Sequence, residues 1–164
     1  MVVVRCTRKL LDRLGQRPRS DATSTTILGD WYATILFTKP QQVILLVNAA
    51  TRLPVVIPTR DGSTIPARFA GGLTDVLTTL EVPVDVIGAE VREMAEVVFT
   101  TTASRSVVGT MNDFANHVEW ALEDGAGGTL HALSLELANT PVGPLRYGRP
   151  RDLACRLLIA PGGA

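Results

Sequence analysis

The sequence is poor in the residue types that most often build a recognisable catalytic or metal site. Among its 164 residues are two cysteines, two histidines and two lysines, and aromatic residues make up 5%. Cys6 and Cys155 form no CxxC pair, and neither has a histidine at zinc-ligand spacing. We expect reduced structural thiols in a cytoplasmic protein, with a disulfide between them as the alternative. No metal and no cofactor are expected.

The chain also lacks a long hydrophobic run and a net charge. Its longest apolar stretch, residues 43–47, is far shorter than the ~20 residues that span a bilayer. No basic segment precedes an apolar run at the N-terminus, so neither a signal peptide nor a membrane partner is expected. Sixteen basic residues balance sixteen acidic ones, which does not support a whole-molecule field that attracts nucleic acid.

The charges are nevertheless distributed unevenly along the chain. Residues 1–20 and 145–156 are rich in arginine, whereas residues 75–124 are acidic and hold Arg105 as one of two bases. The two basic ends either form one face or remain two separate solvated termini. Fourteen of the sixteen basic residues are arginine, a bias that indicates a GC-rich bacterial genome.

Hydrophobic patterning predicts a single α+β domain over residues 1–164, whose composition is typical of a globular protein. Alternating or continuous apolar residues predict an antiparallel meander of strands at 31–38, 43–48 and 53–57, with Pro54 marking an edge or a bulge. Further strands are predicted at 1–6 and 96–102, and helices after Thr7, Pro66 and Pro83 and at 111–124, 129–139 and 149–158. Residues 129–139 also fit a strand, although a helix is favoured. We therefore expect an antiparallel sheet of about four to five strands with helices packed on one face.

The segment 104–113 gathers small hydroxyls, an arginine, an amide and a carboxylate before a well-patterned helix. A helix start presents free backbone N–H groups, and a guanidinium forms forked hydrogen bonds with phosphate or carboxylate. The residues offered to an anionic ligand are Ser104, Arg105, Ser106, Asn112 and Asp113. The alternative is structural, because Thr110 and Asp113 have the spacing of a capping box. The lysine and spacing of a P-loop are missing.

Three functions follow from this segment and the basic ends. The first is a bacterial binding or accessory protein that holds an anionic partner, with nucleic acid among the candidates, through the 104–113 segment together with Arg8 and Lys9. Another is a protein-binding role of the antitoxin or immunity type, or a homo-oligomer.

The remaining function is a hydrolase or nuclease. It would use four side chains: Arg105, Asn112, Asp113 and His117. Asp113 and His117 lie one helical turn apart, so they can form a couple suited to acid–base chemistry. A solvent-exposed pair without function explains the same spacing.

Four blocks of the sequence together resemble a known bacterial family. They are RCTRKLL (residues 5–11), LGDWYA (28–33), SRSVVGTMNDF (104–114) and TPVGPL (140–145). The family is catalogued as domain of unknown function 6933, and the resemblance extends from about residue 3 to residue 158. Its most specific part is S-R-S-V-x-G-[ST]-M-N-D. The resemblance implies that the four blocks belong to one compact unit, and it implies no activity, cofactor or substrate.

Overall fold

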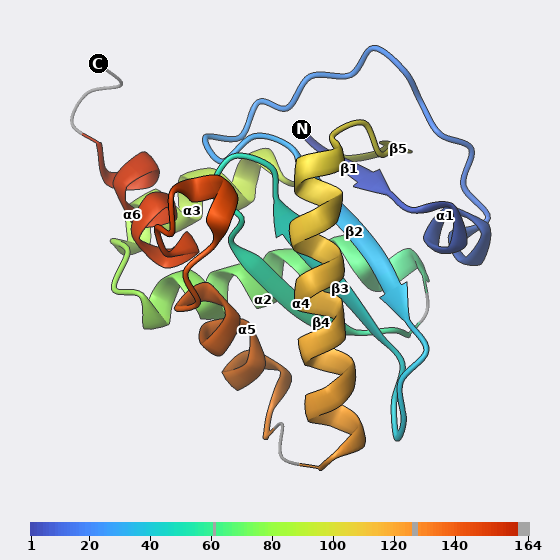
Figure 1. Ribbon diagram of the computed structural model, residues 1–164. Helices are drawn as coiled ribbons and strands as arrows, with labels where there is room; N and C mark the ends of the chain where they lie inside the picture. Colours follow the sequence, from blue (N-terminus) through green and yellow to red (C-terminus); the bar gives the residue numbers. More distant parts are fainter. Residues whose placement is uncertain (61, 126–127, 161–164) are drawn as a thin grey trace.

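The computed structural model describes residues 1–60, 62–125 and 128–160, and over these residues five strands form one mixed sheet (Figure 1). The strand order is β4-β3-β2-β1-β5. The strands are β1 (Val2–Cys6), β2 (Trp31–Leu36), β3 (Val43–Asn48), β4 (Pro54–Pro58) and β5 (Val97–Thr101). The antiparallel meander of β2, β3 and β4 is confirmed, and Pro54 begins the edge strand β4.

The prediction of an antiparallel sheet was wrong for the other half of the sheet. Strand β1 runs parallel to both β2 and β5. Parallel neighbours need long crossover connections, and here residues 7–30 separate β1 from β2. The alternation of apolar residues within a strand does not reveal its direction, so the sequence pattern was compatible with either arrangement.

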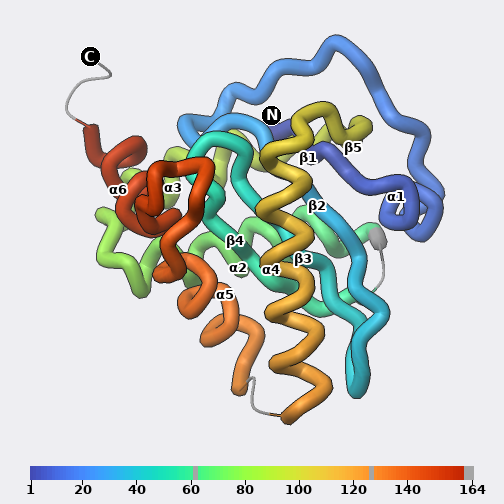
Figure 2. The backbone as a smooth tube through the Cα atoms, viewed as in Figure 1, coloured from blue at the N-terminus to red at the C-terminus, as the bar shows by residue number. Residues whose placement is uncertain are grey.

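Helices cover both faces of this sheet, which corrects the prediction that they pack on one face (Figure 2). Helices α1 (Arg8–Leu14), α2 (Ile65–Thr79), α3 (Val84–Glu93) and α6 (Pro150–Ile159) contribute to one core. Helices α4 (Arg105–Glu123) and α5 (Leu130–Ala138) contribute most of the other. Every residue of β2 and β3 is buried, as expected for central strands covered on both sides.

Alternating side chains of β2 supply both cores. Trp31 packs edge-to-face on Phe69 of α2, with ring centroids 5.0 Å apart. The next residue, Tyr32, belongs to the opposite core together with Met111 and Phe114 of α4. The predicted helix over residues 129–139 is confirmed as α5, and Thr129 caps it by accepting a hydrogen bond from the Ala132 N–H.

Helix α4 begins six residues, about 1.7 turns, before residue 111, where the sequence pattern predicted its start. Ser104 is its N-cap and accepts a hydrogen bond from the Val107 N–H at 3.3 Å. Thr110 and Asp113 therefore lie inside the helix, and the proposed capping box was wrong. Val107 is buried one turn before Met111, so the apolar stripe continues further back than expected.

The two arginine-rich segments do not meet. Helices α1 and α6 lie on opposite sides of the molecule in Figure 1, so the arginines of these helices form no single basic face. Cys6 and Cys155 are unpaired, which excludes the alternative of a disulfide between them. Within the described ranges, no helix is both long and apolar enough to cross a membrane.

Candidate functional site

A cavity of about 490 Å³ lies between α4 and the turn at residues 140–144. Most of its polar lining comes from one stripe of α4, where side chains three or four positions apart share a face. These residues are Arg105, Ser106, Thr110, Asp113 and His117, and Thr140 of the turn adds a further hydroxyl. The apolar lining includes Phe114, Leu137 and Val142, together with two prolines of the turn. The cavity thus joins two of the four blocks that resemble the family, residues 104–114 and 140–145.

The structure brings some of the predicted site residues to this cavity and separates others from it. Arg105, Ser106 and Asp113 line it, whereas Ser104 caps α4 and Asn112 is exposed outside the lining stripe. Asn112 differs because residues in a helix turn by about 100° each, so it faces away from Thr110 and Asp113.

Arg8 and Lys9 lie in a different part of the molecule. Arg8 lines a separate cavity with Cys6 and Thr101, and the Lys9 ammonium lies 6.0 Å from the centre of the Phe37 ring. The predicted combination of these two side chains with Arg105 is therefore not assembled in one cavity.

Arg52, which the sequence analysis did not select, lies directly behind the cavity wall. It occupies the turn between β3 and β4 and is 8% exposed. Its guanidinium donates hydrogen bonds to the Ser106 hydroxyl at 3.1 Å and to the Thr110 hydroxyl at 3.4 Å. It also donates to the Ala49 carbonyl. The sequence could have drawn attention to Arg52 only as an arginine in a short turn between two apolar strands. It does not show which residues such a side chain contacts.

Burial lowers the pKa of the Arg52 guanidinium, and the neighbouring Tyr32 partly offsets this effect. Arg52 forms no ion pair with any of the described residues. The group nevertheless stays charged, since the ordinary pKa of an arginine lies far above neutral pH. A buried positive charge, held by neutral groups, therefore lies behind the hydroxyls of Ser106 and Thr110.

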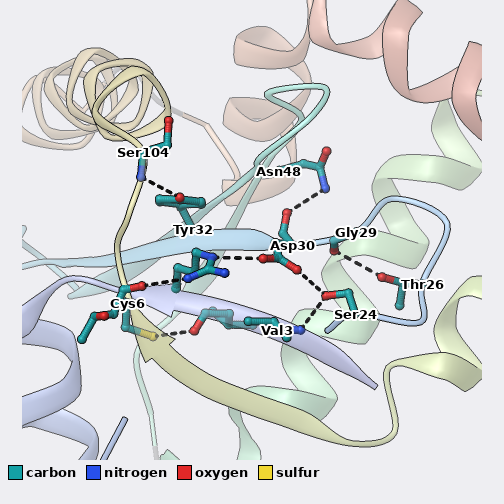
Figure 3. A network of polar contacts seen from close by, with 12 residues as sticks. Val3, Cys6, Ser24, Thr26, Gly29, Asp30, Tyr32, Asn48 and Ser104 are labelled. Atoms are coloured by element: carbon teal, nitrogen blue, oxygen red, sulfur yellow. Dashed lines mark hydrogen bonds and ion pairs between the residues drawn. The ribbon is translucent and has the colours of Figure 1, made fainter. Parts of the chain in front are cut away.

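A polar network next to the start of α4 fixes the loop before β2 and the β3–β4 turn (Figure 3). The Arg5 guanidinium pairs with the Asp30 carboxylate at 3.0 Å, and Ser24 donates to the same carboxylate at 2.7 Å. The Tyr32 hydroxyl accepts a hydrogen bond from the Ser104 N–H at 2.9 Å. Asp30 and Tyr32 of the LGDWYA block thus have structural roles, and Tyr32 ties β2 to the N-terminus of α4.

His117, at the far end of the cavity, pairs with a carboxylate that lies outside the lining. The His117 Nε2 atom lies 3.1 Å from the Glu136 Oε1 atom of α5, and the Trp120 ring is 6.3 Å from the imidazole. Ser106 precedes His117 by eleven residues, about 16 Å along a helix axis. That separation prevents Ser106 from acting as a nucleophile activated by His117.

Comparisons with known proteins supply a family and no activity. A family model described as Domain of unknown function (DUF6933) matches residues 3–153. Comparison with curated proteins and with solved structures gave no significant match. In the part of the chain that the structure describes, no three His, Cys, Asp or Glu side chains gather in a group that could hold a metal ion.

Proposed function

The chain belongs to the family described as Domain of unknown function (DUF6933), and because that description carries no activity, we propose from the cavity that the protein binds a small organic molecule with an anionic group. The observation that carries this proposal is Arg105 at one end of a cavity whose opposite wall is apolar. In the described part of the chain, the ion pairs do not include Arg105, so its charge is open to a ligand.

The size and lining of the cavity support a small molecule. A volume of about 490 Å³ lies within the range of roughly 300–1,000 Å³ that small-molecule sites occupy. Phe114, Leu137 and Val142 would contact an apolar body, while Arg105 and Ser106 would hold its anionic group. Nucleic acid is a weaker candidate, because Arg8 and Lys9 are remote from the cavity and the net charge is zero.

Asp113 does not oppose an anion near Arg105. Eight residues of helix separate the two positions, about 12 Å along the axis, and physiological salt screens exposed charges over about 8 Å. Asp113 and His117 instead suit a hydroxyl or amine at the other end of the ligand. We place this binding protein in a reducing cytoplasm, which two unpaired cysteines support.

Phenyl phosphate, phenyl sulfate and benzoate test the proposal, with benzyl alcohol as a neutral probe. Titrations followed by amide NMR shifts are expected to perturb residues of α4 and the 140–144 turn with the anions and not with the alcohol. Arg105→Gln should weaken binding roughly tenfold or more, since a hydrogen bond to a charged group contributes about 1.5–3 kcal/mol.

Arg13→Gln is the matched control, because Arg13 is exposed on α1. It should leave affinity within about twofold of the wild type, given the small effect of a remote surface charge. No binding of any of the three anions, or equal losses in Arg105→Gln and Arg13→Gln, would contradict the proposal.

A hydrolase is the second candidate, since Asp113 and His117 line the cavity one helical turn apart and Glu136 can orient the imidazole. Arg105 is twelve residues from His117, about 18 Å along the helix axis, and would hold a distant part of the substrate. Asn112 has no part in this version. Turnover of p-nitrophenyl phosphate that His117→Ala abolishes would favour it over binding alone.

A further inference from the structure

We propose that Arg52 supplies, through the Ser106 hydroxyl, the buried half of a two-arginine site for a phosphate monoester. The inference rests on the proposed function and specifies its ligand. Arg105 would contact the phosphate from the cavity side, and Ser106 would donate its hydroxyl proton to a phosphate oxygen. Arg52 is thus a positioning residue that polarises Ser106 from behind.

Among the described residues, the buried charge of Arg52 has no carboxylate partner. Arg52 is 8% exposed, and its hydrogen-bond acceptors are two hydroxyls and one carbonyl. Buried charges in proteins are normally paired with an opposite charge, because neutral acceptors do not repay the lost hydration. A dianion in the adjoining cavity would provide the missing negative charge.

The backbone conformation of Arg52 is also unusual for an arginine. Arg52 has a φ of 62°, in the left-handed region that favours glycine or asparagine. An arginine held there carries strain that its surroundings must impose. Its backbone N–H donates to the Asn48 carbonyl, and the turn is fixed further by the Asn48 side chain. A turn that only had to join β3 to β4 needs neither the strain nor the charge.

The Ser106 hydroxyl acts as the acceptor in its hydrogen bond with Arg52, so its own proton is not used there. The hydroxyl oxygen accepts from the Arg52 Nη2 atom at 3.1 Å. The Thr110 proton is donated to the Ser106 carbonyl at 3.3 Å, whereas over the described residues the Ser106 hydroxyl donates to no protein acceptor. Ser106 is exposed to the cavity and retains its proton for a ligand. A hydroxyl that accepts from a guanidinium is a stronger donor, because hydrogen bonds in a chain polarise one another.

The charge count distinguishes phosphate from carboxylate. Arg52 and Arg105 bring two guanidinium groups to the same end of the cavity, since Ser106 follows Arg105 directly in α4. A phosphate monoester carries a charge of about −1.5 to −2 at neutral pH. This charge balances two guanidinium groups, whereas the single negative charge of a carboxylate or a sulfate ester balances only one.

The experiment compares phenyl phosphate with phenyl sulfate, a monoanion of nearly the same shape, at about pH 7.5 by calorimetry. We expect the wild type to bind phenyl phosphate at least about tenfold more tightly. Arg52→Gln and Ser106→Ala should each reduce that preference to less than about threefold, and Arg52→Lys should restore part of it by restoring the charge. A structural defect would weaken both probes equally and leave the preference unchanged.

The outcomes separate this inference from the proposed function. If both probes bind equally and both depend on Arg105, the proposed function stands and the role of Arg52 is wrong. If neither probe binds, this inference fails, and the proposed function fails with it only if benzoate does not bind either. If Arg52→Gln does not fold, the preference measured for Ser106→Ala tests the inference alone, because this substitution leaves the β3–β4 turn unchanged. If inorganic phosphate binds as tightly as phenyl phosphate, the proposal that the ligand is a phosphate ester is wrong, and the site binds free phosphate.

Discussion

At the scale of the single residue, Asn48 holds together the segments beneath the cavity. Its amide nitrogen donates to the carbonyls of Leu28 and Asp30 at 2.9 and 3.2 Å. Its amide oxygen accepts from the backbone N–H groups of Ala50 and Thr51 at 3.2 and 2.9 Å. One fully buried side chain therefore joins the loop before β2 to the turn that carries Arg52.

Asn48→Ala should destabilise the protein by about 2–4 kcal/mol, because it leaves several buried backbone groups without partners. Urea denaturation measures this change. Asn112→Ala is the matched control, since Asn112 is exposed on α4 and alanine is the better helix former. A loss in Asn48→Ala no larger than the effect of Asn112→Ala would contradict the role given to Asn48.

At the scale of the element, two adjacent glycines in α2 have different environments. A Cβ atom at Gly72 would lie 2.9 Å from a Val55 methyl and 3.1 Å from an Ile57 methyl of β4. A Cβ atom at Gly71 would meet nothing within 4 Å. Gly72 thus lets α2 approach the edge strand closely, and Gly71 has no such role.

Gly71→Ala should stabilise the protein by up to about 1 kcal/mol through helix propensity. Gly72→Ala gains the same propensity, but overpacking against β4 typically costs about 1–3 kcal/mol, so a net loss is expected. Thermal denaturation of both variants checks the pair. Equal shifts of the midpoint in the two variants would show that α2 does not pack against β4 as described.

At the scale of the whole molecule, Glu90 of α3 links a helix to the loop before β2 and makes stability depend on pH. Its buried carboxylate accepts from the N–H groups of Ile27 and Leu28 at 2.8 and 3.0 Å. Burial raises the pKa of Glu90, more than these hydrogen bonds lower it, and the nearby Glu93 raises it further.

Because the pKa of Glu90 is raised on folding, the folded protein binds this proton more tightly than the unfolded chain does. The resulting stability is complete below the unfolded pKa of about 4.3 and is lost as the pH rises through the folded pKa. The unfolding free energy of the wild type minus that of Glu90→Gln should therefore fall as the pH rises above about 4.3.

Glu93 supplies a control of opposite sign in the same experiment. A hydrogen bond from Thr25 and the terminal amine lower its pKa. The stability it contributes is therefore present above the unfolded pKa and lost as the pH falls. Urea titrations of Glu90→Gln and Glu93→Gln should diverge in opposite directions from the wild type, and parallel curves would refute both assignments.

Much of the fold could be predicted because its signals are local. Gly15 ends α1 in the left-handed conformation, and Pro54 begins an edge strand, as their chemistry predicts. The candidate site was predictable in part, since Arg105 and Asp113 share a helix face. Arg52 was not, because it reaches Ser106 across 54 positions of the chain.

The sequence by itself determined where most strands and helices lie, and that residues 104–114 carry most of the polar content of the candidate site. Only the tertiary structure decided that β1 is parallel to its neighbours, that helices cover both faces, and that Arg52 lies behind Ser106. The physical reason is the distance along the chain over which each interaction acts. Periodicity, capping and turn chemistry act over a few residues, whereas strand direction and the meeting of two arginines depend on connections between segments far apart in the chain.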